Sequence, residues 1–266
     1  MQAIYRPKAN SPAEEYAPLA CNLYKGCSHA CIYCYAPAAT WNNTPEKRAA
    51  FHADPQPREG ILEALERDAK KLEQKGERGP VLLCFTCDPY QQLELEFCYT
   101  RQAIKTLYWH GLRPKVLTKA GVSARHDLHL LRQANGAFGV SLTGLSHQVR
   151  AKYEPGAHAS GFDRVDNLRA AMGLNVATWA SFEPVLNPNW TIRAIEEAAA
   201  YCNLIAVGKL NHMAPPEPIH WPSFRIQAIN LLESMNFTRV DKATVQQGPF
   251  LDKRHYYIKQ DLENAG

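Results

Sequence analysis

The chain has 266 residues, of which 45% are hydrophobic and 21% are charged, a composition typical of a globular protein. This length accommodates one α/β domain of barrel size or two small domains. The formal net charge of +4 is too small to argue for a nucleic-acid partner, although it permits one. No stretch approaches the roughly 18 apolar residues of a membrane-spanning helix, so we expect no membrane segment.

The amino-terminal segment and the cysteine content indicate the cellular compartment. Residues 1–8 lack the apolar core of a secretory signal, which predicts a cytoplasmic protein. In a reducing compartment, we expect the eight cysteines to be metal ligands, reactive thiols or buried apolar residues rather than disulfides.

Short apolar runs alternate with longer amphipathic segments along most of the chain. The clearest helix covers residues 60–75, where Ile61, Leu65 and Ala69 share one face. In chain order, the pattern predicts a strand at 18–22, a helix at 60–75, a strand at 81–86, a helix at 94–110, a strand at 115–118, a helix at 125–134, a strand at 137–142, a helix at 161–172, a strand at 175–180, a helix at 191–201, a strand at 204–207 and a helix at 222–235.

This alternation amounts to about six strand–helix units, which predict a parallel sheet covered by helices. An open doubly wound sheet and a barrel both satisfy the pattern, and in either of them ligands bind beyond the carboxyl ends of the strands. No linker marks a domain boundary. We therefore expect residues 1–236 to form one domain, with residues 237–266 as a C-terminal extension packed on it.

Three cysteines lie close together directly after the first predicted strand. Cys27, Cys31 and Cys34 form a C-x3-C-x2-C triplet, and soft thiolates of this kind favour iron–sulfur clusters or zinc. A structural zinc site is closed by four ligands, and His29 is poorly placed to complete a tetrahedron with its immediate neighbours. Three thiolates leave one iron of a cubane cluster open for chemistry. Buried or zinc-bound structural cysteines are the alternative.

The triplet and the aromatic residue after it resemble the defining motif of the radical S-adenosylmethionine (SAM) superfamily. The resemblance implies a partial (β/α)6 barrel in which Cys27, Cys31 and Cys34 ligate a [4Fe–4S] cluster. It also implies that SAM chelates the fourth iron and is cleaved to a 5′-deoxyadenosyl radical, with Tyr33 packed near the adenine. The segments similar to a narrower group, the spore photoproduct lyase-like branch, are residues 22–35, 86–94, 116–119, 125–128 and 154–156.

Polar residues at the ends of the third and fourth predicted strands are candidates for binding SAM. The resemblance implies that Lys119 pairs with the SAM carboxylate, and an exposed loop lysine is the alternative. Ser141 and Thr143 are candidates for the ribose or the carboxylate. Hydroxyl groups bonded to the backbone are the alternative for both.

The end of the second predicted strand departs from the superfamily pattern. The superfamily contacts the SAM amino group there, and Thr86 occupies that place, but the usual Gly-Gly-Glu is missing. Asp88 and Glu183 are the candidates to substitute for it. A carboxylate before proline also favours a turn, which is the alternative for Asp88.

Cys84 is the candidate catalytic residue, because a thiol near a radical is able to donate or return a hydrogen atom. In the branch named above, a cysteine lies two residues before the strand-end hydroxyl, and Cys84 has that position relative to Thr86. Side chains alternate along a strand, so Cys84 and Thr86 should share a face, with Cys87 opposite Thr86 or starting the loop. A buried apolar role is the alternative for Cys84. His212 and His220 follow the sixth strand and are weaker candidates.

These residues predict an enzyme that abstracts hydrogen from a substrate, with a [4Fe–4S] cluster and SAM as cofactors. The candidate substrates are a DNA base, a modified nucleotide or a thymine photoproduct, which a duplex must extrude to reach the barrel mouth. A peptide or small-molecule substrate is one alternative, and a non-enzymatic iron–sulfur or zinc module is another. The expected partners are an electron donor such as flavodoxin or ferredoxin and a nucleic acid or nucleotide, without a membrane.

Overall fold

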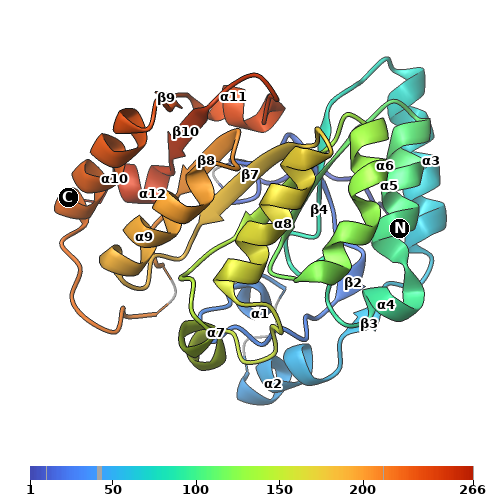
Figure 1. The fold of residues 1–266 in the computed structure, drawn as a ribbon. Coiled ribbons are helices and arrows are strands. Elements are labelled where there is room, and N and C mark those ends of the chain that lie inside the picture. The colour runs from blue at the N-terminus through green and yellow to red at the C-terminus, as the bar shows by residue number, and fades with distance from the viewer. Residues whose placement is uncertain (10, 41–43, 212, 266) are drawn as a thin grey trace.

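The computed structural model describes residues 1–9, 11–40, 44–211 and 213–265. Its centre is one eight-stranded sheet in which every neighbouring pair of strands is parallel (Figure 1). In spatial order the strands are β1 (Leu19–Cys21), β4 (Pro80–Leu83), β5 (Arg113–Thr118), β6 (Ala137–Ser141), β7 (Ala177–Phe182), β8 (Leu204–Val207), β10 (His255–Ile258) and β9 (Thr238–Arg239). The sheet forms an open, partial barrel that does not close on itself, as predicted for the fold class.

The outer face of the sheet is covered by α3 (Ile61–Gln74), α5 (Tyr99–Trp109), α6 (Leu128–Gln133), α8 (Gly161–Gly173), α9 (Pro188–Ala199) and α10 (Trp221–Ser234) (Figure 1). The shorter helices between strands and near the C-terminus are α4 (Glu94–Phe97), the 3-10 helix η1 (Val122–Asp127), α7 (His147–Tyr153), α11 (Lys242–Gln247) and α12 (Gln260–Glu263). Within the described ranges, no helix has the length and apolar character needed to cross a membrane.

A long excursion separates β1 from α3 and contains the three clustered cysteines. Its two ends are joined by an antiparallel ribbon of β2 (Tyr24–Lys25) and β3 (Gln56–Pro57). Between them lie α1 (Ala36–Ala39) and α2 (Pro45–Ala53), and α2 begins at a capping bond from the Lys47 N–H to the Thr44 side chain. Pro45 at the first helical position suits this start, because its missing N–H would have had no partner there. The ribbon therefore returns the chain to the sheet after the cysteines.

The two faces of the sheet bury different kinds of side chain, since alternate residues of a strand point to opposite faces. On β6, Phe138 and Val140 pack outward against the helices, whereas Ala137 and Gly139 face inward. The small inward residues leave room for Trp179 of β7, which is fully buried and donates a hydrogen bond from Nε1 to the Val116 carbonyl at 2.9 Å. The interior of the partial barrel is thus filled at one level by a single large ring.

A buried lysine joins segments from both ends of the chain to this interior. The Lys115 ammonium donates to the carbonyls of Tyr16 and Val245 at 2.8 Å each, and it lies 4.8 Å from the centre of the Trp179 ring. Lys115 is only 1% exposed. The residues before β1 and helix α11 are therefore held against the inner face of the sheet.

The predicted pattern of six strand–helix units is confirmed, with two local exceptions. The strand expected at 81–86 ends at Leu83, because Cys84 takes a left-handed backbone conformation (φ 62°) that leaves the pleated geometry. The helix expected at 94–110 is interrupted at Cys98 (φ 53°) for the same reason. Residues 237–266 contribute β9 and β10 to the main sheet, and their separation as an extension stays a prediction.

The close contact between Gly139 and Trp179 gives a test of this interior. A Cβ at residue 139 would lie 2.2 Å from Trp179 Nε1, so we expect Gly139→Ala to lower the free energy of unfolding by about 1–3 kcal/mol through overpacking. Gly173→Ala is the control, because a Cβ at the end of α8 meets nothing within 4 Å. Urea unfolding of both variants measures the difference. Equal stabilities would contradict the packing described here.

Candidate functional site

A cavity opens at the carboxyl ends of the strands, the edge at which parallel sheets bind ligands. It encloses about 1080 Å³ of empty space, part of it open to solvent. All but one of the residues predicted for the site line it. They are Cys27, Cys31, Tyr33, Cys34, Cys84, Thr86, Asp88, Lys119, Ser141 and Glu183. The exception is Thr143, which is buried nearby and hydrogen-bonds Glu154 at 3.3 Å.

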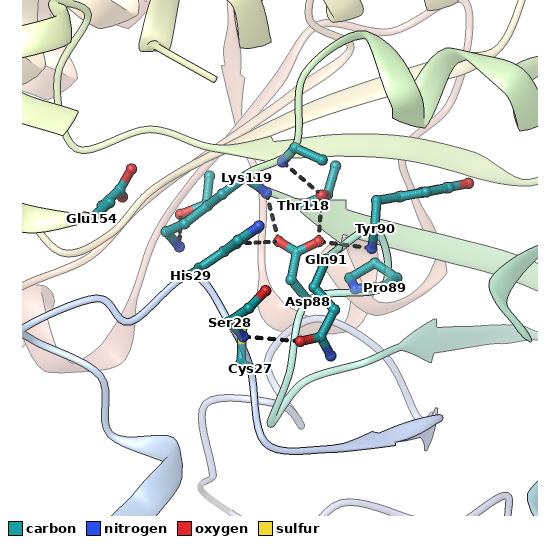
Figure 2. Close-up of polar contacts among 12 residues, drawn as sticks. Cys27, Ser28, His29, Asp88, Pro89, Tyr90, Gln91, Thr118, Lys119 and Glu154 are labelled. Carbon is teal, nitrogen blue, oxygen red and sulfur yellow. Dashed lines mark hydrogen bonds and ion pairs between the residues drawn. The ribbon is translucent and has the colours of Figure 1, made fainter. Parts of the chain in front are cut away.

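The loop that carries the cysteines is held by the segment after β4. Gln91 is fully buried, accepts the Ser28 N–H at 2.9 Å and donates to the Gly26 carbonyl at 3.3 Å. Asp88 of the same segment lies against His29, with 3.3 Å between Oδ2 and Nδ1 (Figure 2). Because the loop has almost no regular structure of its own, these side chains replace the backbone bonds that a helix or strand would supply.

Asp88 is fully engaged by protein groups. Its Oδ1 accepts from the Tyr90 N–H at 2.8 Å and from the Thr118 hydroxyl at 2.6 Å, and its Oδ2 accepts from the Lys119 N–H at 2.7 Å (Figure 2). Burial alone would raise the pKa of Asp88, but His29 and these hydrogen bonds outweigh it and hold the pKa at about 2. Asp88 therefore stays ionised and positions its neighbours rather than presenting a vacant oxygen to the cavity.

A buried ion pair supports the other side of the cysteine loop. Glu154 and Arg164 are each 1% exposed and lie 2.5 Å apart, and Arg164 also donates to the Ser141 carbonyl at 2.9 Å. The Tyr33 hydroxyl donates to Glu154 Oε1. Burial would raise the pKa of Glu154, but Arg164, Lys119 and Tyr33 hold it at about 2. The position of the Tyr33 ring is therefore fixed by a carboxylate that remains charged.

The residues on either side of Glu154 also contact the cysteine loop directly. The Gly156 N–H donates to the His29 carbonyl at 3.0 Å, and the Ile32 N–H donates to the Tyr153 carbonyl at 3.0 Å. A Cβ at residue 156 would lie 1.9 Å from the Ser28 carbonyl oxygen, so only glycine permits this approach. The Glu-Pro-Gly sequence at 154–156 thus has a structural function at the loop.

Lys119 lies between the cysteine loop and the far wall of the cavity. Its ammonium donates to the Ser141 hydroxyl at 2.9 Å and lies 5.8 Å from the centre of the Tyr33 ring. Ser141 in turn donates to the Glu183 carbonyl at 3.2 Å. A cation held by one neutral partner at a cavity wall is suited to binding a carboxylate.

The three clustered thiols fit an iron–sulfur cubane better than a single metal ion. All three are free cysteines that line the same cavity. In the part of the chain that the structure describes, no three His, Cys, Asp or Glu side chains converge on one metal position, as zinc would require. In a cubane, by contrast, each thiolate binds a different iron. Burial raises the pKa of the Cys31 thiol to about 12, so binding iron must displace its proton.

Cys84 and Cys87 form a C-x2-C pair beside this site, and both line the cavity together with Thr86. Cys84 was expected on a strand, but it lies just beyond the end of β4, and Cys87 lies in the loop, one of the two positions predicted for it. Burial, followed by the neighbouring Cys87 thiol, raises the pKa of Cys84 well above its ordinary value. The Cys84 sulfur therefore keeps its hydrogen at neutral pH.

Sequence reasoning missed several residues that build the site. Gln91 and Arg164 gave no signal, because a single buried polar residue looks like any surface residue in a sequence. Tyr16, which lines the cavity, and Lys259, which bonds the lining residue Glu183, also gave no signal in the sequence. Of the two weaker histidine candidates, His212 lies outside the described residues, and His220 caps the start of α10 by accepting the Ser223 N–H.

The chain is similar to known proteins in sequence and in fold. A model of the Radical SAM superfamily matches residues 21–202, and a comparison with curated protein sequences gave no match. A structure of spore photoproduct lyase with bound AdoMet and dinucleoside spore photoproduct is similar at a TM-score of 0.60 and 16% identity, over 94% of this chain and 78% of that one. Streptococcus suis SuiB bound to S-adenosylmethionine is similar at a TM-score of 0.55 and 8% identity, over 77% and 43% of the two chains. The TM-scores show a shared fold, and at such low sequence identity the similarity extends no further than the fold.

The contact between Asp88 and His29 gives a prediction for the cysteine loop. Asp88→Asn removes the charge that faces His29, so we expect a metal centre on the loop to release iron to a chelator about 10-fold faster, the scale typical of groups that support metal ligands. Asp166→Asn is the control, since that carboxylate is half-exposed and, among the residues described, forms an ion pair only with Arg169 on α8. Equal rates of iron release would show that Asp88 does not stabilise the loop.

Proposed function

The chain belongs to the radical SAM superfamily, and we propose that Cys27, Cys31 and Cys34 are the ligands of its [4Fe–4S] cluster. The protein is an enzyme of this superfamily with the cluster and SAM as cofactors. When bound, the reduced cluster and SAM supply a 5′-deoxyadenosyl radical that abstracts hydrogen from a substrate. The observation that carries the assignment is that the three thiols line one cavity without converging on a single ion.

The neighbouring polar residues divide into groups that contact SAM and groups that position them. Lys119 and Ser141 provide a cation and a hydroxyl for the SAM carboxylate, and the ring of Tyr33 packs near the adenine. Thr86 provides a hydroxyl at the end of β4. Asp88 and Thr143 act through His29 and Glu154, because their own polar atoms already have protein partners.

Cys84 serves as the hydrogen-atom donor of the site. Its sulfur lines the cavity and stays protonated, which is the form that delivers a hydrogen atom to a carbon radical. The S–H bond breaks homolytically, the hydrogen forms a C–H bond on the substrate, and the unpaired electron remains on sulfur. Exclusion of water from this buried position prevents side reactions.

The substrate that the site supports best is a nucleotide or a DNA base. Over 94–95% of the chain, the fold is similar to that of spore photoproduct lyase structures holding a dinucleoside spore photoproduct. The cavity is also lined by Tyr35 and Phe85, whose ring centres lie 5.3 Å apart, and a base is able to stack on aromatic rings of this kind. An electron donor such as flavodoxin or ferredoxin in the cytoplasm would reduce the cluster.

Anaerobic reconstitution tests the cofactor assignment. We expect about four iron atoms per chain and release of 5′-deoxyadenosine on reduction with dithionite, both lost in the variant with Cys27, Cys31 and Cys34 changed to alanine. Zinc in place of iron, or a cluster inert toward SAM, would contradict the assignment.

Deuterium transfer tests the substrate and the role of Cys84. Deuterated thymine dinucleotides should pass deuterium into 5′-deoxyadenosine, whereas transfer only from a peptide or small molecule would exclude the nucleotide.

Cys84→Ala tests the hydrogen-atom donor. The variant should retain SAM cleavage but lose at least about 100-fold in product yield, because solvent water is excluded from the cavity and does not readily supply a hydrogen atom to the substrate radical. Cys98→Ala, which changes a cysteine outside the cavity lining, is the control. Unchanged product yield in Cys84→Ala would assign hydrogen donation to another group.

A further inference from the structure

A second polar cluster lies in the cavity wall formed by the ends of β7 and β10. It consists of Tyr16, Ser181, Glu183 and Lys259. Tyr16 and Lys259 lie outside residues 21–202, the part of the chain that matches the superfamily model. The wall is therefore built around Glu183, which lies within the matched part, by residues from outside that part.

One oxygen of Glu183 is fixed by protein donors. Its Oε2 lies 2.6 Å from the Lys259 ammonium and accepts from the Tyr16 hydroxyl at 3.1 Å. Lys259 is 1% exposed and lies 4.8 Å from the centre of the Tyr16 ring. The Tyr16 hydroxyl is also within 2.8 Å of Ser181 Oγ, so a second contact fixes its position beside Glu183.

The neighbouring strand makes space for this ion pair. Gly208 follows β8, and a Cβ there would lie 2.8 Å from Lys259 Cδ and 3.1 Å from Glu183 Cδ. Stability alone does not account for the arrangement, since well-packed apolar residues of similar volume often stabilise a folded protein as much as a buried ion pair does, or more. The chain therefore keeps a charged pair, and the space for it, where it faces the cavity.

The other oxygen of Glu183, Oε1, has no partner among the residues that the structure describes. No described residue hydrogen-bonds to Oε1, while the side chain is 21% exposed and lines the cavity. A carboxylate oxygen in a cavity wall is satisfied by a donor that arrives with the ligand. Lys209, one residue beyond Gly208 on the adjacent strand end, lines the same cavity and carries a donor.

From these contacts we propose that Glu183 is the specificity-determining residue for the substrate, and that it accepts a hydrogen bond from a ring N–H beside a carbonyl. Lys209 donates to that carbonyl. The matching chemical class is the imide or lactam edge of thymine, uracil, guanine or hypoxanthine, whereas adenine and cytosine lack the ring N–H. The proposal rests on the nucleotide substrate proposed above and adds which edge of the base is recognised.

The test measures equilibrium binding, without turnover, to the reconstituted, unreduced enzyme saturated with SAM. The probes are thymidylyl-thymidine and the same dinucleotide methylated at both N3 positions. We expect the wild type to bind the methylated probe about 10- to 100-fold more weakly, the range for hydrogen bonds to a charged group. In Glu183→Gln, Lys259 holds the amide oxygen on its side, so the NH2 group faces the cavity and the preference for the unmethylated probe is lost.

Two further variants separate this effect from misfolding. Glu73→Gln makes the same chemical change where a half-exposed glutamate pairs with the buried His110, and it should leave the preference intact. Gly208→Ala keeps every charge but displaces the Glu183–Lys259 pair, and it should weaken the preference as Glu183→Gln does. Iron content and the affinity for SAM, measured in each variant, report whether the cofactor site remains intact.

The outcomes distinguish this inference from the proposed function. Equal binding of both probes by the wild type overturns the inference alone. Binding of neither probe overturns the nucleotide substrate and the inference together. A Glu183→Gln variant that keeps the preference but loses affinity for SAM would assign Glu183 to the cofactor and overturn the inference.

Discussion

The contact between Asp88 and His29 joins the loop that carries the three cysteines to the carboxyl end of β4. The loop has little regular backbone structure, and ordering each of its residues costs about 1–2 kcal/mol of conformational entropy. Asp88, Gln91 and Gly156 offset that cost from two separate segments, one after β4 and one after α7. The cysteines are therefore positioned by the sheet through side chains, and every other feature of the site depends on that position.

The sheet serves two purposes because its faces differ in chemistry. Its outer face packs against helices through large apolar residues, and this packing provides the rigidity on which the strand ends depend. Its inner face packs around Trp179 and, toward the carboxyl ends, carries Lys119 and Ser141, which line the cavity, and Lys259, which pairs with Glu183. Asp88 and Glu154 stay charged near them, since hydrogen bonds and cations hold the pKa of each at about 2. Fixed charges of this kind bind a charged ligand without reorganising when it arrives.

The sequence predicts those parts of the molecule that follow from local pattern. Apolar runs place the six central strands, and the spacing of Cys27, Cys31 and Cys34 indicates the cluster, because three thiolates within eight residues belong to one loop, and all three line the cavity. The end of β4 at Cys84 was not predictable, since a left-handed residue other than glycine is fixed by tertiary contacts. The pairing of Glu154 with Arg164 was not predictable either, because nothing in the spacing of two charges says that both are buried. The parallel pairing of β10 with β8 was not predictable, because it depends on contacts between segments that lie far apart in the sequence.

The wall of the cavity that carries the cysteines and the wall around Glu183 come from different parts of the chain. The cysteine loop, Lys119 and Ser141 lie within residues 21–202, the part that matches the superfamily model, and they surround the space for the cofactors. Tyr16 lines the cavity from the amino-terminal end of the chain, Lys259 holds Glu183 from the carboxyl-terminal end, and Lys115 holds the segment that carries Tyr16 against the inner face. A change in these terminal segments would alter what meets Glu183 while leaving the cysteine loop untouched. The same radical chemistry can therefore be directed to a different substrate by replacing the outer wall alone.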